Sequence, residues 1–519
     1  MNILRYIAVI ACVMTSAIAF GQTRTVEVLP DSIGALNFAI LGDTTEMGFR
    51  VDSSTVYVLK RNGVYKTVGE IRNPGFDLTI RAEEGAGSMP IIQPAVVTGG
   101  ISVRPFTALG NLTLEGVYVT SIDDLGTYIN RIVRAQADNI RITFRDCWFD
   151  GSGQSVVRFD NVGAKVYMEN CIVSHIGRTF VPNNGRVIDF RTNADSLVLV
   201  NNTFFNITQR LMRVTAGRAV RYANISNNTI VNVAQLVADF EQCAEARFVD
   251  NLVVNGVFLG NSRGGEMLDL VPLTPANADL VDVDQDDQSA EVTNNWFHTT
   301  PGVLEVWADS ISSVPLYDSV LVAFTGIDSL DLIAEPFTFM GPVQFKSPPP
   351  LPQNTIEGMI FDQLFADNLD NGSAPNWNFN TSPFFLVNNA TIQFPWQFPF
   401  DLSYSPSSPA AVASSTGGPV GDPRWELEEF NVITGFDRVW EDHPMRLYPN
   451  PAKENFEVVL EGESVRHIEI LDVRGLTIGS FEGDNLTGAI DISEFNNGLY
   501  FVRVTDVRGN TFTNRLIKR

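Results

Sequence analysis

The chain has 519 residues and a formal net charge of −24, because 60 acidic side chains outnumber 36 basic ones. A surface so acidic repels phosphate backbones, which excludes nucleic acid as a partner. Hydrophobic residues make up 44% of the chain, so it can bury a large core and is not generally disordered.

Residues 1–21 have the pattern of a signal peptide. Arg5 supplies the positive charge, residues 6–14 form the apolar region, and Ala17 and Ala19 are the small residues of a cleavage site. No later stretch reaches the roughly 18 apolar residues that a transmembrane helix needs. We therefore expect export through the periplasm, with no transmembrane segment once the signal is removed.

A short phrase recurs between residues 110 and 300: a polar residue, usually Asn, followed by two to four apolar or β-branched residues. Its copies begin at Asp146, Asn170, Asn202, Asn228, Asn251 and Asn295. Consecutive copies lie 23 to 44 residues apart. A unit of about two dozen residues with insertions is typical of a solenoid, whose loops absorb the insertions while its strands stack.

Each unit contains three short runs rich in β-branched and aromatic residues, such as 156–160, 165–169 and 171–173. These runs are too short for helices and predict strands. Three strands per turn, with an Asn at the second bend, resemble the right-handed parallel β-helix of pectate-lyase-like proteins. A β-sandwich is the alternative, but its connections would not return one phrase at this spacing.

The recurring Asn has a physical function in such a fold. Asn tolerates the left-handed backbone conformation of a sharp bend, and stacked amides can form hydrogen bonds from rung to rung. The sequence therefore predicts that Asn170, Asn202, Asn228 and Asn251 stack at one corner.

The resemblance extends to both ends of the solenoid. Residues 56–65 and 78–92 resemble the opening rungs of β-helix surface proteins known as domains of unknown function, and residues 408–425 resemble their closing segment. This implies a fold and a surface location, without a reaction. The aromatic-rich residues 377–400 are expected to pack as part of a cap rather than to stack on sugars.

Three cysteines remain after signal removal: Cys147, Cys171 and Cys243. No pair has metal-ligand spacing, and buried free thiols are the expected state. A disulfide between Cys147 and Cys171 stays open, provided that the two lie on adjacent rungs.

From Met445 the sequence changes to short alternating strands, which predict a small β-sandwich. The phrase Tyr-Pro-Asn-Pro at 448–451, Gly-Leu-Tyr at 498–500 and the terminal Arg-Leu-Ile-Lys-Arg resemble the C-terminal sorting domain of type IX secretion substrates. The resemblance implies that residues 445–519 bind the type IX secretion machinery, and that the protein is secreted or attached to the outer-membrane surface. A binding module of similar fold is the alternative.

Residues suited to catalysis are scarce. His175 and His298 form no Ser-His-Asp, Cys-His or HExxH arrangement, and both are expected at the surface or in turns. The run from Asp282 begins like a calcium loop, but Asp287 stands where Gly is required and Thr293 where a bidentate Glu is required. We therefore expect no metal and no cofactor. A looser surface calcium site stays open beside a solvated acidic insertion.

Alignment of the first strand of four successive units predicts which side chains point outward. Alternation places Val133, Ala135 and their equivalents inward. The two outward columns are then Arg134, Arg158, Asp189 and Arg213, and Gln136, Asp160, Arg191 and Thr215.

In the families that this fold resembles, substrate lies along this outer face. Arginine forks suit uronate carboxylates or sulfates, and Asp accepts from sugar hydroxyls. We predict a groove that binds anionic glycan. Its centre comprises Arg158, Asp160, Asp189, Arg191 and Arg213. Cross-strand charge pairing on a solvated sheet is the alternative.

The predicted fold class is all-β: a right-handed parallel β-helix followed by a small C-terminal β-sandwich. The predicted domains are the signal peptide (1–21), the β-helix with its caps (22–425), a linker (426–444) and the sorting domain (445–519). A non-catalytic polysaccharide-binding protein is favoured, and no catalytic residue is assigned. The alternative is a polysaccharide lyase or glycoside hydrolase acting on uronate-containing glycan, although the motifs of pectate lyases and polygalacturonases are absent.

Overall fold

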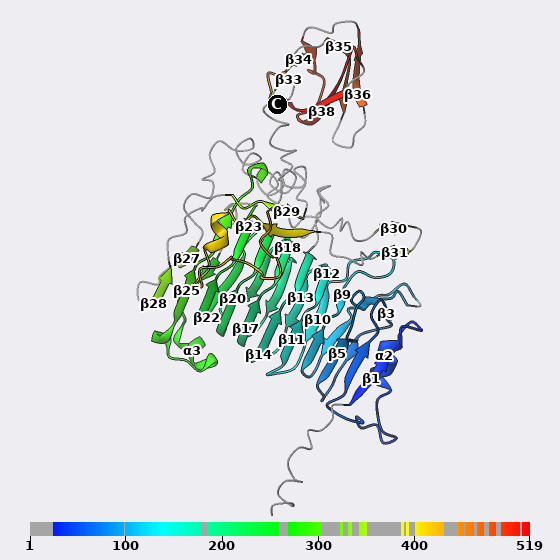
Figure 1. Cartoon of the computed structure of the whole chain (residues 1–519), viewed down its shortest axis with the longest axis vertical. Coiled ribbons are helices and arrows are strands. Elements are labelled where there is room, and N and C mark those ends of the chain that lie inside the picture. The colour runs from blue at the N-terminus through cyan, green and yellow to red at the C-terminus, as the bar shows by residue number, and fades with distance from the viewer. Residues whose placement is uncertain are drawn as a thin grey trace, which may run out of the picture. The chain divides into compact units, whose positions relative to one another are not determined.

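The protein is described from a computed structural model (Figure 1). The described residues are 24–97, 99–177, 184–258, 268–303, 322–324, 331–334, 342–349, 386–388, 391–393, 400–429, 445–450, 452–460, 464–471, 477–483, 489–508 and 511–518. The predicted signal peptide, most of the predicted linker and most of the aromatic-rich segment lie outside these ranges. The chain divides into two compact units, residues 1–430 and 431–519.

The first unit is a parallel β-helix with three strands in each turn, seen as stacked arrows in Figure 1. The first sheet comprises β1 (Thr25–Val28), β2 (Val56–Leu59), β5 (Leu78–Ala82), β8 (Leu112–Glu115), β11 (Arg141–Arg145), β14 (Ala164–Glu169), β17 (Ala194–Val200), β20 (Ala219–Ser226), the end of β22 (Ala238–Val249), β25 (Ser289–Thr293) and β28 (Asp331–Ala334).

The second sheet comprises β4 (Ile71–Arg72), β7 (Phe106–Ala108), β10 (Arg131–Ala135), β13 (Ser155–Phe159), β16 (Arg186–Phe190), β19 (Arg210–Val214), the start of β22, β24 (Leu268–Leu270) and β27 (Val322–Phe324). The third sheet comprises β3 (Val64–Thr67), β6 (Ile91–Pro94), β9 (Tyr118–Thr120), β12 (Trp148–Ser152), β15 (Ile172–Ile176), β18 (Thr203–Ile207), β21 (Thr229–Val233), β23 (Leu252–Gly256) and β26 (Trp296–His298).

One continuous apolar core fills the inside of the β-helix. Phe144 and Phe149 pack with their ring centroids 4.5 Å apart, and Phe159 and Phe190, on adjacent rungs, pack with tilted rings at 5.1 Å. At the N-terminal end, helix α2 (Ala35–Leu41) buries Leu36 and Ile40 against this core. A second helix, α3 (Pro275–Val281), lies in the insertion between β24 and β25.

A ladder of asparagine side chains follows the corner before the third sheet. Asn202 Nδ2 donates to Asn228 Oδ1 at 3.0 Å, Asn228 Nδ2 to Asn251 Oδ1 at 3.0 Å, and Asn251 Nδ2 to Asn295 Oδ1 at 2.9 Å. The predicted stacking is therefore confirmed for Asn202, Asn228 and Asn251, and Asn295 extends it.

The prediction for Asn170 was wrong by one residue. The main-chain N–H of Cys171 donates to Asn202 Oδ1, so Cys171 holds the ladder position on its rung. Asn170 lies one residue earlier, where the chain turns with a positive φ. The residues of this turning column are Asp146, Asn170, Asn201, Asn227, Asp250 and Asn294, with φ between 51° and 59°. On each of these rungs, one residue makes the sharp bend, and the residue after it holds the ladder position.

Cys147 and Cys171 occupy equivalent positions on adjacent rungs, because Trp148 pairs with Ile172. Both thiols are free and buried, as is Cys243.

A return segment, residues 342–349 and 400–429, covers the outer face of the third sheet. It contains β29 (Phe345–Ser347), β32 (Asp401–Tyr404) and the 3₁₀ turn η3 (Pro409–Val412). Its apolar residues pack against outward side chains of the third sheet, including Trp148 and Phe205. Thr203 Oγ1 donates to Asp422 Oδ2 at 2.7 Å and accepts from Trp425 Nε1 at 2.8 Å. The predicted closing segment, residues 408–425, therefore binds to the outer face of the third sheet at its central rungs.

The second unit consists of two antiparallel sheets around a shared core. One sheet contains β33 (Met445–Tyr448), β34 (Asn455–Leu460) and β37 (Ile490–Asp491), and the other contains β36 (Thr477–Glu482), β35 (Val465–Leu471), β38 (Gly498–Asp506) and β39 (Thr511–Lys518). In the first unit, β30 (Leu386–Asn388) also pairs antiparallel with β31 (Thr391–Gln393). Across the described ranges, no helix has both the length and the apolar character needed to cross a membrane.

Candidate functional site

The second sheet carries the predicted site residues on its outer side. In the parallel register Arg134 pairs with Arg158, Arg158 with Asp189, and Asp189 with Arg213. We call these four residues the central column. Asp160 and Arg191 directly follow β13 and β16, and their main-chain N–H groups donate to Ala135 and Phe159 of the preceding rungs. The structure thus brings all five predicted residues onto one face.

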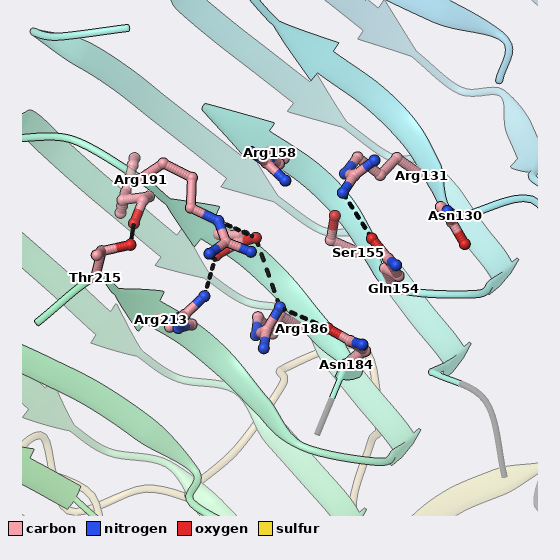
Figure 2. Close-up of polar contacts among 12 residues, drawn as sticks. Asn130, Arg131, Gln154, Ser155, Arg158, Asn184, Arg186, Arg191, Arg213 and Thr215 are labelled. Carbon is pink, nitrogen blue, oxygen red and sulfur yellow. Dashed lines mark hydrogen bonds and ion pairs between the residues drawn. The ribbon is translucent and has the colours of Figure 1, made fainter. Parts of the chain in front are cut away.

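Each carboxylate of this face is surrounded by arginines. Asp160 Oδ2 accepts from Arg134 Nε at 2.6 Å, and Asp160 Oδ1 accepts from Arg158 Nε at 2.7 Å. Asp189, with only 2% of its side chain exposed, lies 3.0 Å from Arg191 Nε and 3.4 Å from Arg213 Nη1. Figure 2 shows the guanidinium groups of Arg186, Arg191 and Arg213 directed toward one another.

A further row of site residues was missed from the sequence. Arg131 pairs with Ser155, Ser155 with Arg186, and Arg186 with Arg210, each at the start of its strand. We call these four residues the entry column, and the two columns together with Asp160 and Arg191 the arginine face. The entry column lies three positions before the central column, where strict alternation places side chains inward.

The strands do not alternate strictly at this point. Two consecutive residues, Ile132 and Val133, are both fully buried in the core, and so are their equivalents on the next three strands. The additional inward residue allows Arg131 and Arg134 to face the same side of the sheet. The sequence signal for this arrangement was an Arg or Ser followed by two apolar residues, which recurs in four strands.

Burial and mutual repulsion act on the arginines of the entry column. Burial and, to a smaller extent, neighbouring guanidinium groups such as Arg158 together lower the pKa of Arg131 to about 10. Burial likewise lowers the pKa of Arg186 to about 9, although Asp189 opposes this shift. Burial alone would raise the pKa of Asp160, but its hydrogen bonds to arginine lower it on balance. The face is therefore a partly dehydrated cationic surface.

The arginine face adjoins an acidic pair on the following rungs. Asp239 forms an ion pair with Arg210 and lies opposite Asp269 in the register of β22 and β24. Burial raises the pKa of Asp239 to about 6, against the opposing effect of Arg210. Its Oδ1 atom is buried and has no hydrogen-bond partner among the described residues.

A buried polar cluster on the third sheet corrects one prediction. His175 was expected at the surface or in a turn, but it is completely buried in β15. Its Nδ1 lies 2.7 Å from Asp150 Oδ1, and that carboxylate also accepts from Ser174 and from Tyr118. Asp150 is itself fully buried, so the cluster connects rungs rather than facing a polymer. His298 is half-buried, and burial lowers its pKa.

In the described part of the chain, no group of three or more His, Cys, Asp or Glu side chains could hold a metal ion. The acidic run at 282–287 forms an exposed turn, in which the Asp284 side chain accepts from the main-chain N–H of Asp286.

Comparison with known proteins identifies the tail. Residues 446–519 match the family described as the secretion system C-terminal sorting domain. This domain implies that the chain is exported by the type IX system and is then secreted or attached to the cell surface. No curated protein and no solved structure matches the chain.

Proposed function

We propose that this exported protein binds acidic polysaccharide through the arginine face of its β-helix. One observation carries the proposal: the face gathers positive charge on a chain of net charge −24. Its arginines are Arg131, Arg134, Arg158, Arg186, Arg191, Arg210 and Arg213, and its carboxylates are Asp160 and Asp189.

The geometry suits a polymer better than a single small anion. Adjacent strands of a sheet lie about 4.8 Å apart, so the columns repeat their charges along the axis of the helix. Guanidinium forks bind carboxylates and sulfates in a directed manner. Asp160 and Asp189 hold the forks in place and offer acceptors to sugar hydroxyls.

The test is retention of the full chain on immobilised acidic polysaccharide, with the double substitution Arg158→Ala and Arg191→Ala. Asp160 keeps Arg134 as a partner, and Asp189 keeps Arg186 and Arg213, so neither carboxylate loses all its arginines. We therefore expect retention to be lost while the melting temperature stays the same.

The matched control removes the same charge from the first sheet, with Arg141→Ala and Arg221→Ala, both at exposed positions. This variant should be retained like the wild type. Retention of the Arg158/Arg191 variant would refute the proposal. If the control variant loses retention to the same extent, binding depends on net charge and not on the arginine face.

A second candidate function is hydrolysis of the same polymer, which the unpartnered Oδ1 of Asp239 beside Asp269 favours. Residues on adjacent rungs lie about 4.8 Å apart, near the roughly 5–5.5 Å between the two carboxyl groups of retaining glycosidases. Release of reducing ends from polygalacturonate or alginate would support this candidate. No release from acidic polymers that the protein retains would end it.

A further inference from the structure

The entry column places a buried hydroxyl between two arginines. Ser155 pairs with Arg131 on one neighbouring strand and with Arg186 on the other. Ser155 is only 1% exposed and Arg186 only 6%. Figure 2 shows Ser155 between the two guanidinium groups and beside Gln154, with Asn184 next to Arg186.

Two polar atoms of this group lack a hydrogen-bond partner among the described residues: Oγ of Ser155 and Nε of Arg131. A buried donor without an acceptor destabilises a fold, so native proteins pair nearly all such groups. Both atoms can donate a hydrogen bond to an anion, and they lie on adjacent strands.

The hydrogen-bond partner of Arg131 in this group carries no charge. Arg131 Nη2 donates to Gln154 Oε1 at 2.6 Å, and this amide oxygen is neutral. Arg186 Nη1 donates to the neutral Oδ1 of Asn184 at 3.2 Å and lies 3.7 Å from Asp189, which Arg191 and Arg213 share. A guanidinium that is partly removed from water beside a neutral partner is costly, and an anion bound at Arg131 would reduce that cost.

We propose that Arg131, Ser155 and Arg186 form a subsite for one oxyanion carried by the polymer, either a uronate carboxylate or a sulfate half-ester. Arg131 Nε and Ser155 Oγ donate to the anion, and Arg186 supplies the second positive charge. The subsite rests on the proposed function and deepens it, because it assigns one charged substituent to a position separate from Arg158 and Arg191.

The test is calorimetric titration of the full chain with galacturonate, a sulfated galactose and neutral galactose, at matched ionic strength. The informative variant is Ser155→Ala. It should weaken binding of the preferred charged sugar about tenfold or more, as expected for a lost hydrogen bond to a charged group. Because the free hydroxyl has no partner, the melting temperature should stay the same or rise. A merely structural serine would show the opposite pattern.

Two further variants make the test specific. Arg131→Gln removes the charge and should abolish the preference for charged sugars over galactose. Arg141→Gln, at an exposed position of the first sheet, removes the same charge elsewhere and should bind like the wild type. The charged sugar that binds identifies the anion as carboxylate or sulfate.

The subsite is overturned if neither charged sugar binds better than galactose, or if Ser155→Ala binds as tightly as the wild type. The Arg158/Arg191 double variant separates this inference from the proposed function. If both hold, it loses the polymer but still binds the charged monosaccharide. Loss of both ligands in this variant would place the anion at Arg158 and Arg191 and overturn the subsite. If the double variant retains the polymer while Ser155→Ala weakens binding of the charged sugar, the proposed function alone is overturned.

Discussion

The asparagine ladder allows a sharp prediction, because two neighbouring asparagines perform different physical tasks. Asn228 is completely buried, and its Oδ1 accepts from the main-chain N–H of Asn202 at 2.9 Å and from the Asn202 amide at 3.0 Å. Its Nδ2 group donates to Asn251 Oδ1 and to the main-chain oxygen of Leu199. Asn227, one residue earlier, has a φ of 55°.

Asn228→Ala removes the shared acceptor of two buried donors on Asn202. Each unsatisfied buried donor costs about 1–3 kcal/mol, so the free energy of unfolding should fall by about 4 kcal/mol. Asn228→Asp keeps the shape and the acceptor but turns an oxygen toward Asn251 Oδ1 and the Leu199 carbonyl. It should destabilise the protein at least as strongly at neutral pH.

The control is Asn227→Gly, since glycine adopts positive φ without steric cost. We expect it to change the free energy of unfolding by less than about 1 kcal/mol. Urea titration of the three variants and the wild type, followed by circular dichroism, measures the differences. The reasoning is refuted if Asn228→Ala costs no more than Asn227→Gly.

Two more predictions concern single buried groups. Asp239 has a folded pKa of about 6, above its ordinary 3.8, so its charge penalty is absent below about pH 4, grows as pH rises and is complete above pH 6. One pKa unit corresponds to about 1.4 kcal/mol. The free energy of unfolding of Asp239→Asn, relative to the wild type, should therefore rise by about 2–3 kcal/mol between pH 4 and pH 7. If this difference is the same at both pH values, Asp239 does not carry a buried charge. Thr203→Val removes the hydroxyl that joins Asp422 to Trp425 and should lower the free energy of unfolding by about 2 kcal/mol. Denaturant titration tests this, and an unaltered midpoint would show that the return segment is held by apolar packing alone.

The repeated phrase was sufficient to predict the parallel β-helix, but not its full register. In the later rungs an Asn or Asp with positive φ directly precedes the ladder Asn, as at Asn201 and Asn202. At Asn170 the turning residue is followed by Cys171, so the Asn at that bend was assigned to the wrong column. A residue type that serves both tasks cannot by itself separate two adjacent positions.

The site shows a different limit of sequence reasoning. Period-two alternation predicted the central column, where the strands are regular. It failed at Arg131, because two consecutive inward residues follow the first residue of each strand. The position of such an irregularity depends on how the preceding turn enters the strand, and this depends on contacts between rungs.

The outer faces of the three sheets of the β-helix differ in polarity and charge. The return segment covers the apolar outer face of the third sheet. On the first sheet, several basic side chains pair with acids on an adjacent rung, as in the ion pairs of Arg145 with Glu115 at 2.9 Å and of Arg247 with Glu291 at 2.7 Å. On the second sheet the arginines of the arginine face outnumber its carboxylates, and Arg131 donates to a neutral amide oxygen. The excess of positive charge on the outer face of the second sheet costs electrostatic free energy. A ligand that supplies the missing negative charge accounts for that cost.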